Sequence, residues 1–338
     1  MEKIVKFLKL ALSVLTAIVV TIGGLTSSGG EKTPGHTLRL TAVLVSDTHI
    51  TNELYRRLVF VPGIHDISVN IQPDLFLCAG DNTDNGNEEN WKALQRLLNQ
   101  YLKADEIILA LGNHDTWLSY EEDDHEYEPA RDNYLRFTNA LMGTENTQVY
   151  FKREIKGYTF LVMGTEDSTT DATISEAQVQ WLAQEMKAAY EAAPDKPIFV
   201  VNHHPLNFTH TVGDNMDEHG FADQRINDRV RAILSQYPNV VYISGHQHYA
   251  LCMAGESSPH PGFQTVEVLD NTVTSLNLPC FTSGDFLEED NRGTGLLGQG
   301  LVLYVYDDCI ELWGRNFALN HWFEGFHVTI PLTNVENE

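Results

Sequence analysis

The sequence predicts an α/β domain with a largely parallel sheet, extended at its C-terminal end by further strands. Two patterns indicate this fold class. Short apolar runs rich in Val, Ile and Leu alternate with segments of helical periodicity, and the region 260–332 shows strand patterns with little helix. The chain has 338 residues, of which 42% are hydrophobic, so it can bury a large core without disulfide bonds or structural metal ions.

Five apolar runs have the length and composition of buried strands. They cover residues 38–46, 74–79, 106–111, 197–202 and 240–244. Between them, apolar residues at three- and four-residue spacing predict helices over 91–102, 179–189 and 226–234. Ser175 and Gln178 occupy capping-box positions before the second of these helices, and Pro238 follows the end of the third.

The C-terminal region is expected to form strands separated by turns, over residues 265–269, 301–306, 310–314 and 326–330. No linker rich in Pro, Gly or Ser divides this region from the one before it. We therefore interpret residues 31–338 as one domain, with a core over 38–250 and a β extension over 260–332.

The first thirty residues have the pattern of an export signal. Lys3, Lys6 and Lys9 precede an apolar run over 10–22, and small residues follow over 23–30. The run is shorter than the roughly 20 residues of a spanning helix, which favours a cleaved signal peptide. No A-x-A cleavage site is present, so an uncleaved N-terminal anchor stays open. Either reading predicts a secreted or cell-surface protein.

Net charge and cysteine usage disfavour several classes of function. The formal net charge of -25 and the lack of a basic stripe disfavour long nucleic acid as a partner, although the acid excess also suits a protein that only needs to stay soluble. The four cysteines form no C-x-x-C pair, which disfavours zinc ribbons and thioredoxin-type sites. Cys78 lies in a predicted strand, whereas spacing alone does not decide whether Cys252 and Cys280 form a disulfide bond.

Polar residues of metal-ligand type follow each of the five predicted central strands. They are Asp47-Thr48-His49, Asp81-Asn82-Thr83-Asp84, Asn113-His114-Asp115, His203-His204 and His246-Gln247-His248. Any one of these segments alone is more often a turn, a surface loop or a satisfied core histidine. Open α/β sheets place their sites at the carboxyl ends of their strands, so the series of five predicts one shared site.

This ordered series resembles the motifs of the calcineurin-like metallophosphoesterase family over residues 38–250. The resemblance implies a four-layer sandwich of two mixed β-sheets flanked by helices, with the C-terminal strands completing one sheet. It also implies two divalent metal ions, whose identity (Mn, Fe, Zn or Co) mixed oxygen and imidazole ligands do not decide.

Carried over onto this sequence, the family pattern assigns metal ligands as follows. One ion would be held by Asp47, His49, Asp81 and His248, and the other by Asp81, Asn113, His203 and His246. The shared Asp81 carboxylate would offset the repulsion between ions about 3.5–4 Å apart.

Two further residues, His204 and Asp84, lie beside the predicted ligands in the sequence. His203 is preferred to His204 as a ligand, because the first His of such a pair usually binds metal in the family. Asp84 stands where purple acid phosphatases carry a metal-binding Tyr, and it is expected to orient a ligand.

The resemblance implies hydrolysis of small organic phosphate mono- or diesters by a metal-activated water, without a covalent intermediate. His114 would stabilise charge and protonate the leaving group, and Asp115 would hold its imidazole. The alternative is a catalytically silent cell-surface binding protein on the same scaffold, which would be expected to lack a ligand or His114. Oligomeric state is not predicted.

Features that could set substrate preference are open to two interpretations. The acidic segment 121–128 and the segment 210–219 either line the pocket or are solvated surface loops. Trp117 and Tyr249 either stack on an organic leaving group or belong to the core.

Overall fold

The computed structural model describes residues 35–119, 126–210, 220–253, 263–270, 272–282 and 297–333. The predicted export signal, most of the acidic segment 121–128 and most of the segment 210–219 lie outside these residues. None of the helices in the described ranges combines the length and the apolar character needed to span a bilayer.

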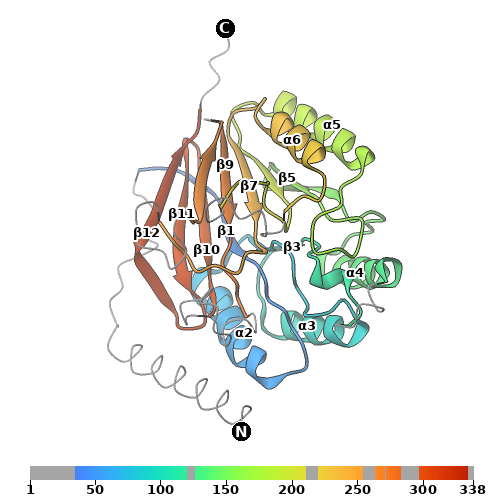
Figure 1. The fold of residues 1–338 in the computed structure, drawn as a ribbon. Helices are drawn as coiled ribbons and strands as arrows, with labels where there is room; N and C mark the ends of the chain where they lie inside the picture. The colour runs from blue at the N-terminus through green and yellow to red at the C-terminus, as the bar shows by residue number, and fades with distance from the viewer. Residues whose placement is uncertain are drawn as a thin grey trace.

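Two six-stranded sheets form the centre of the molecule (Figure 1). The first has the order β12-β11-β10-β1-β2-β3, with β1 (Leu38–Val45), β2 (Leu75–Cys78), β3 (Glu106–Leu109), β10 (Gln299–Tyr306), β11 (Cys309–Asn316) and β12 (His321–Pro331). The second has the order β4-β5-β6-β7-β9-β8, with β4 (Phe151–Ile155), β5 (Tyr158–Val162), β6 (Ile198–Val201), β7 (Val240–Ser244), β8 (Val266–Leu269) and β9 (Val273–Asn277).

Both sheets are mixed. In the first sheet β1, β2 and β3 are parallel, whereas β10 pairs with β1 in antiparallel orientation. In the second sheet β5, β6, β7 and β9 are parallel, and the edge strands β4 and β8 are antiparallel to their neighbours. The five strands that carry the polar motifs therefore all belong to parallel stretches, three in the first sheet and two in the second.

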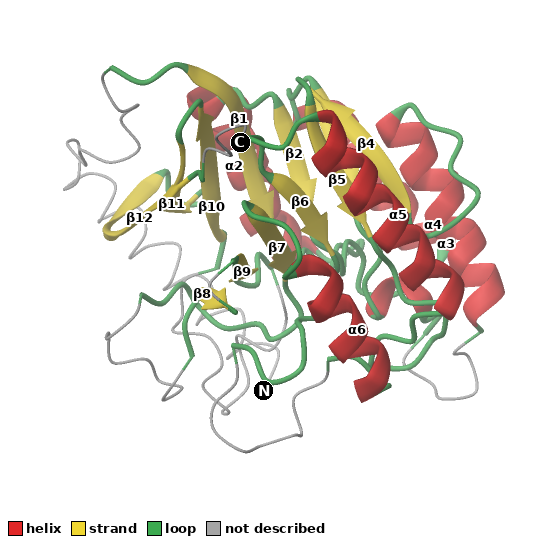
Figure 2. Ribbon diagram, turned by 90° about the horizontal axis from the view of Figure 1, so that it is seen from above, coloured by secondary structure: helices red, strands yellow, loops and turns green. Residues whose placement is uncertain are grey.

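The sheets pack face to face and helices cover their outer faces, which gives four layers. Leu40 and Leu44 of β1 share one core cluster with Phe160 of β5 and Phe199 of β6. The outer face of the first sheet packs on α2 (Leu54–Asp66), α3 (Glu88–Tyr101) and α4 (Tyr127–Met142), and that of the second on α5 (Glu176–Ala192) and α6 (Gln224–Leu234). Figure 2 shows α5 and α6 lying together beside the second sheet.

The predicted α/β sandwich of two mixed sheets is confirmed. Ser175 caps α5 as expected, because its side chain accepts a hydrogen bond from the backbone N–H of Gln178. The C-terminal strands divide between the sheets: β10, β11 and β12 complete the first, whereas β8 joins the second through β9. The hairpin β4–β5, strand β9 and helices α2 and α4 were not predicted.

Candidate metal centre

The five polar motifs converge where the two sheets meet. The loop after β1 is bonded to the loop after β2, since the N–H of Asp47 donates to the Gly80 carbonyl (3.1 Å) and the N–H of His49 to the Asp81 carbonyl (2.9 Å). The loop after β7 spans both sheets, because the N–H of His246 donates to the Asp47 carboxylate (3.2 Å). Loops from separate strands thus form one connected structure.

Five of the seven predicted metal ligands adopt left-handed backbone conformations. Their φ angles are 55° at Asp47, 41° at His49, 48° at Asp81, 74° at His246 and 57° at His248. Such conformations are uncommon for residues other than glycine, and they concentrate at functional sites because the surrounding structure must hold them. The positive φ values therefore mark the loops after β1, β2 and β7 as backbone held in place by its surroundings.

Two glycines allow the loops to approach each other closely. Gly80 has a φ of 113°, and a Cβ there would lie 2.5 Å from the His203 ring. A Cβ on Gly112 would lie 2.1 Å from the Asp81 carboxylate oxygen Oδ1. Any side chain at either position would push a predicted ligand out of place.

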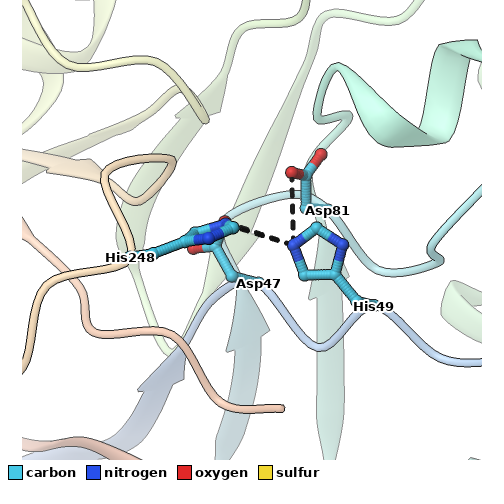
Figure 3. Close-up of side chains that lie close together, drawn as sticks. All are labelled: Asp47, His49, Asp81 and His248. Carbon is cyan, nitrogen blue, oxygen red and sulfur yellow. Dashed lines mark hydrogen bonds and ion pairs between the residues drawn. The ribbon is translucent and has the colours of Figure 1, made fainter. Parts of the chain in front are cut away.

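The first cluster contains Asp47, His49, Asp81 and His248, whose donor atoms all lie within 4.8 Å of one another. The Nε2 atom of His248 is 3.0 Å from Asp47 Oδ1, and the Nε2 atom of His49 is 3.6 Å from Asp81 Oδ2. Figure 3 shows the four side chains pointing toward one another, with Asp47 and His49 on one loop and Asp81 and His248 on two others. The structure therefore brings together the four residues predicted to hold one ion.

The second cluster contains Asp81, His203 and His246, again with donor atoms within 4.8 Å. The Nε2 atom of His203 lies 3.2 Å from Asp81 Oδ2 and 3.3 Å from His246 Nδ1. The Nδ1 atom of His203 contacts the Ala79 carbonyl (3.0 Å), which turns Nε2 toward the cluster. Asn113, the fourth predicted ligand, is 1% exposed. Asp81 is common to both clusters.

The donor atoms fit two divalent ions. Asp47 Oδ1, Asp81 Oδ2 and Asn113 Oδ1 are buried and accept no well-directed hydrogen bond from the described residues. These atoms belong to the three predicted oxygen ligands, and buried oxygens without donors are costly. In each cluster two imidazole nitrogens face each other, at 3.2 Å for His49 and His248 and at 3.3 Å for His203 and His246. For an ion about 2.1 Å from both nitrogens of such a pair, the nitrogen–ion–nitrogen angle would be about 100°, which is suitable for coordination.

Electrostatics keep the carboxylates ionised. Burial disfavours the charge on Asp47, but His248 and His203 outweigh it and hold its pKa well below the usual range. Asp81 likewise has a lowered pKa, because the charges of His203 and His114 outweigh burial. At His203, burial lowers the pKa of the ring, but the charges of Asp81 and Asp47 outweigh burial and raise that pKa to about 9. The two carboxylates are therefore available as anionic ligands at neutral pH.

His114 lies beside the centre and outside the two clusters described above. Its backbone N–H donates to Asp81 Oδ1 (2.9 Å), its Nδ1 atom contacts the Asp84 carbonyl (3.0 Å), and its ring packs on Trp117 with centroids 4.3 Å apart. Burial lowers the pKa of His114 to about 4.

The contacts of Asp115 differ from the expected ones. The Asp84 carbonyl, and not the Asp115 carboxylate, contacts the His114 ring. The Asp115 carboxylate instead accepts hydrogen bonds from the backbone N–H and side chain of Asn82, from the backbone N–H and hydroxyl of Thr83, and from the backbone N–H of Gly112. Asp115 thus ties the loop after β3 to the loop that carries Asp81. Burial and the charge of Asp81 raise its pKa to about 6.

Comparison with known proteins agrees with the motifs and the fold. Residues 40–250 match the sequence model of the family described as calcineurin-like phosphoesterase. The chain belongs to this family. It is 24% identical over 219 residues to a protein of Arcobacter nitrofigilis named probable glycerophosphodiester phosphodiesterase GpdQ, an alignment that covers 61% of this chain and 71% of that protein.

Two solved structures share the calcineurin-like phosphoesterase fold with this chain. A dimetal phosphatase from Danio rerio superposes with a TM-score of 0.60 at 12% identity, covering 88% of this chain and all of that one. The purple acid phosphatase PPD1 from yellow lupin superposes with a TM-score of 0.58 at 10% identity, covering 88% of this chain and 55% of that one. At these identities the similarity concerns the fold.

Several neighbours of the calcineurin-like site have structural contacts. His204 is buried and its Nε2 atom contacts the Thr170 carbonyl (2.8 Å), outside the two clusters. Tyr249 is 3% exposed and packs on Phe263, so it belongs to a small core. All four cysteines lie in the described ranges, and the structure forms no disulfide bond among them.

Two supports of the site had not been predicted. Arg56 of α2 contacts the loops of His49 and Asp84, but in the sequence it is one of two adjacent arginines without a distinguishing pattern. Residues 280–282 lie beside the loop after β1, where the N–H of Phe281 donates to the Ser46 carbonyl (3.0 Å) and that of Thr282 to the Asp47 carbonyl (3.2 Å). Nothing in the local sequence indicates this pairing.

Proposed function

We propose that the chain hydrolyses small organic phosphate esters with a dinuclear metal centre. The observation that carries this proposal is the position of Asp81, whose carboxylate belongs to both clusters of metal-ligand side chains. A carboxylate placed between two ions of like charge is the arrangement expected of two-metal hydrolysis. Asp47, His49 and His248 would hold one ion with Asp81, and Asn113, His203 and His246 would hold the other with it.

When bound, two divalent ions supply Lewis acidity and a nucleophile derived from water at neutral pH. The side chains of the protein fix the ligand geometry and handle the leaving group. The Asp84 carbonyl engages Nδ1 of His114, so any proton that His114 gives to a leaving oxygen must come from Nε2. Its backbone bond to Asp81 Oδ1 keeps the imidazole beside the bridging carboxylate. No serine, cysteine or aspartate nucleophile is required in this scheme.

Diesters and monoesters are both proposed as substrates. The Arcobacter nitrofigilis relative is named as a glycerophosphodiester phosphodiesterase, which supports a diester of a small alcohol. The guanidinium of Arg56, which contacts the site loops, is bound by Asp84. The positive charge of Arg56 is therefore paired within the protein. A site with this charge already paired suits esters of low charge better than polyphosphates.

We further propose that the enzyme acts outside the cytoplasm. The support is the sequence pattern of residues 1–30, with three lysines before an apolar run. N-terminal sequencing of the protein recovered outside the cell would test this directly. A mature protein beginning near residue 30 supports a signal peptide, retention of Lys3 in a membrane fraction supports an anchor, and confinement to the cytoplasm refutes both.

The activity is tested with the full chain loaded with manganese, by comparing p-nitrophenyl phosphate with bis-p-nitrophenyl phosphate. Metal content is measured on the same samples, and a chelator-treated sample and the Asp81→Asn variant purified identically exclude a contaminating phosphatase. Hydrolysis that both controls abolish supports the proposal, and the preferred ester separates diesterase from phosphatase. Two bound ions with neither ester cleaved would favour the silent binding protein instead.

A further inference from the structure

A buried arginine supports the loops that carry the metal centre. Arg56 on α2 is 5% exposed. Its Nη1 atom donates to the His49 carbonyl (2.6 Å), and its Nη2 atom lies 2.6 Å from Asp84 Oδ1. One planar guanidinium thereby joins helix α2 to the loop after β1 and the loop after β2, which together carry three predicted ligands, Asp47, His49 and Asp81.

Asp84 links Arg56 to the imidazole rings of His49 and His114. The same Oδ1 atom that meets Arg56 lies 3.4 Å from Nδ1 of His49, and the carbonyl of Asp84 contacts Nδ1 of His114 (3.0 Å). Both rings therefore have Nδ1 directed to Asp84, and the Nε2 atom of His49 points to Asp81 and His248. A partner on Nδ1 fixes the tautomer and the ring rotation that a metal-binding Nε2 requires.

The arginine is needed because of where Asp84 lies. The side chain of Asp84 is only 12% exposed, and a buried carboxylate without a cationic partner is strongly unfavourable. Without the guanidinium, Asp84 would turn toward water or give up its charge, and His49 would lose the partner of its Nδ1 atom. A lysine would keep the charge, but its single ammonium could not reproduce the planar fork that reaches a carboxylate and a carbonyl together.

We infer that Arg56 is a positioning residue, which acts through Asp84 to hold the His49 and His114 rings in the orientation that the metal centre needs. The inference rests on the proposed function, because it assigns His49 as a metal ligand. Its central consequence is a change in metal affinity, which can be measured without any substrate.

The test compares Arg56→Met with a matched control in the same chain. Arg315 and Asp66 also form a buried ion pair, at 2.7 and 2.8 Å, and Asp66 ends the same helix α2. Arg315→Met therefore removes a guanidinium from a similar environment away from the ligands. Manganese stoichiometry and affinity are measured by competition with a chelating dye, and the folded fraction of each variant is measured by circular dichroism and thermal unfolding. Hydrolysis of the p-nitrophenyl esters is followed separately.

Arg56→Met should weaken manganese binding at one of the two sites by about 10- to 100-fold, as loss of an outer-shell partner commonly does. Arg315→Met should lower the melting temperature while leaving manganese affinity per folded chain unchanged. Arg56→Lys should give an intermediate affinity.

Two results would overturn the inference: wild-type affinity in folded Arg56→Met, or an equal loss of affinity in Arg315→Met. A wild-type chain that binds two ions without cleaving either ester would refute the proposed activity and leave the affinity comparison decisive for Arg56. A wild-type chain that binds no divalent ion would overturn both proposals.

Discussion

Replacing His114 with Ala separates proton transfer from metal binding. General acid catalysis contributes about 10²–10⁴-fold, and burial lowers the pKa of His114 to about 4, so the ring is mostly neutral at pH 7. This favours the lower half of the range, a loss of about 10²–10³-fold, which corresponds to about 3–4 kcal/mol in the barrier. The backbone N–H that binds Asp81 Oδ1 remains in the variant, so the metal ligands should keep their places.

The assay compares two leaving groups at constant metal content. A p-nitrophenolate leaves without a proton, whereas an alkoxide needs one, so His114→Ala should slow a dialkyl phosphodiester far more than bis-p-nitrophenyl phosphate. Equal losses on both substrates would show that the ring stabilises charge and does not donate the proton. Loss of a metal ion would refute the reasoning altogether. In that case His114 would be a ligand, in the cluster that it forms with His49 and Asp84.

Three other changes test separate parts of the structure. Asp81→Asn should abolish binding of both ions, measured by elemental analysis against the exposed-loop control Asp307→Asn, and full occupancy would exclude the bridging role. Asp47→Gly and Asp47→Ala should both lose metal. Because Asp47 has a φ of 55°, the Gly variant should be more stable than the Ala variant by about 1 kcal/mol in urea unfolding. A more stable Ala variant would show that the left-handed conformation is not strained. His210 is buried with its ring nitrogens on the Gln264 carbonyl and the Ser275 hydroxyl, and burial lowers its pKa, so the unfolded chain binds the extra proton below about pH 6.5. Stability should fall as the pH drops below that value, and His210→Gln should reduce the slope by up to about 1.4 kcal/mol per pH unit in chelator-treated protein, an unchanged slope counting against the assignment.

The parts of the fold that the sequence predicts are those with strong local signals. The five motif-bearing strands are continuous apolar runs, and α5 begins at a serine cap, so both could be located without tertiary information. Helix α2 contains Pro62 and has no clear polar face, so its periodicity is weak. The hairpin β4–β5 turns at Lys156 and Gly157, and β4 carries three consecutive charged residues over 152–154, a pattern that also suits a surface loop.

Sheet assignment could not be predicted from local pattern. Strand β10 pairs with β1 across more than two hundred residues, and only the packing of both on the same helices and facing sheet selects that partner. The ligand types were predictable because each follows a strand that must end at the same edge of a sheet. The partner of a buried carboxylate was not predictable: Asp115 was expected at His114, yet three loop residues supply its donors.

The backbone of the C-terminal extension takes part in the centre although none of the predicted ligands lies in it. Asp47 and His49 hold left-handed conformations that each cost about 1–3 kcal/mol, and such strain persists only where neighbouring structure fixes it. The loop between them is fixed on one side by the loop after β2, and on the other by residues 280–282, where Thr282 bonds the carbonyls of both Asp47 and Thr48. Residues 280–282 connect directly to β9 of the second sheet, while the loop itself leaves β1 of the first. The ligand loop is therefore held between the two sheets, and these hydrogen bonds offset part of the cost of its strained conformations. The extension therefore supports the site through its backbone. The ligand motifs end at His248, so they do not indicate this role in the sequence.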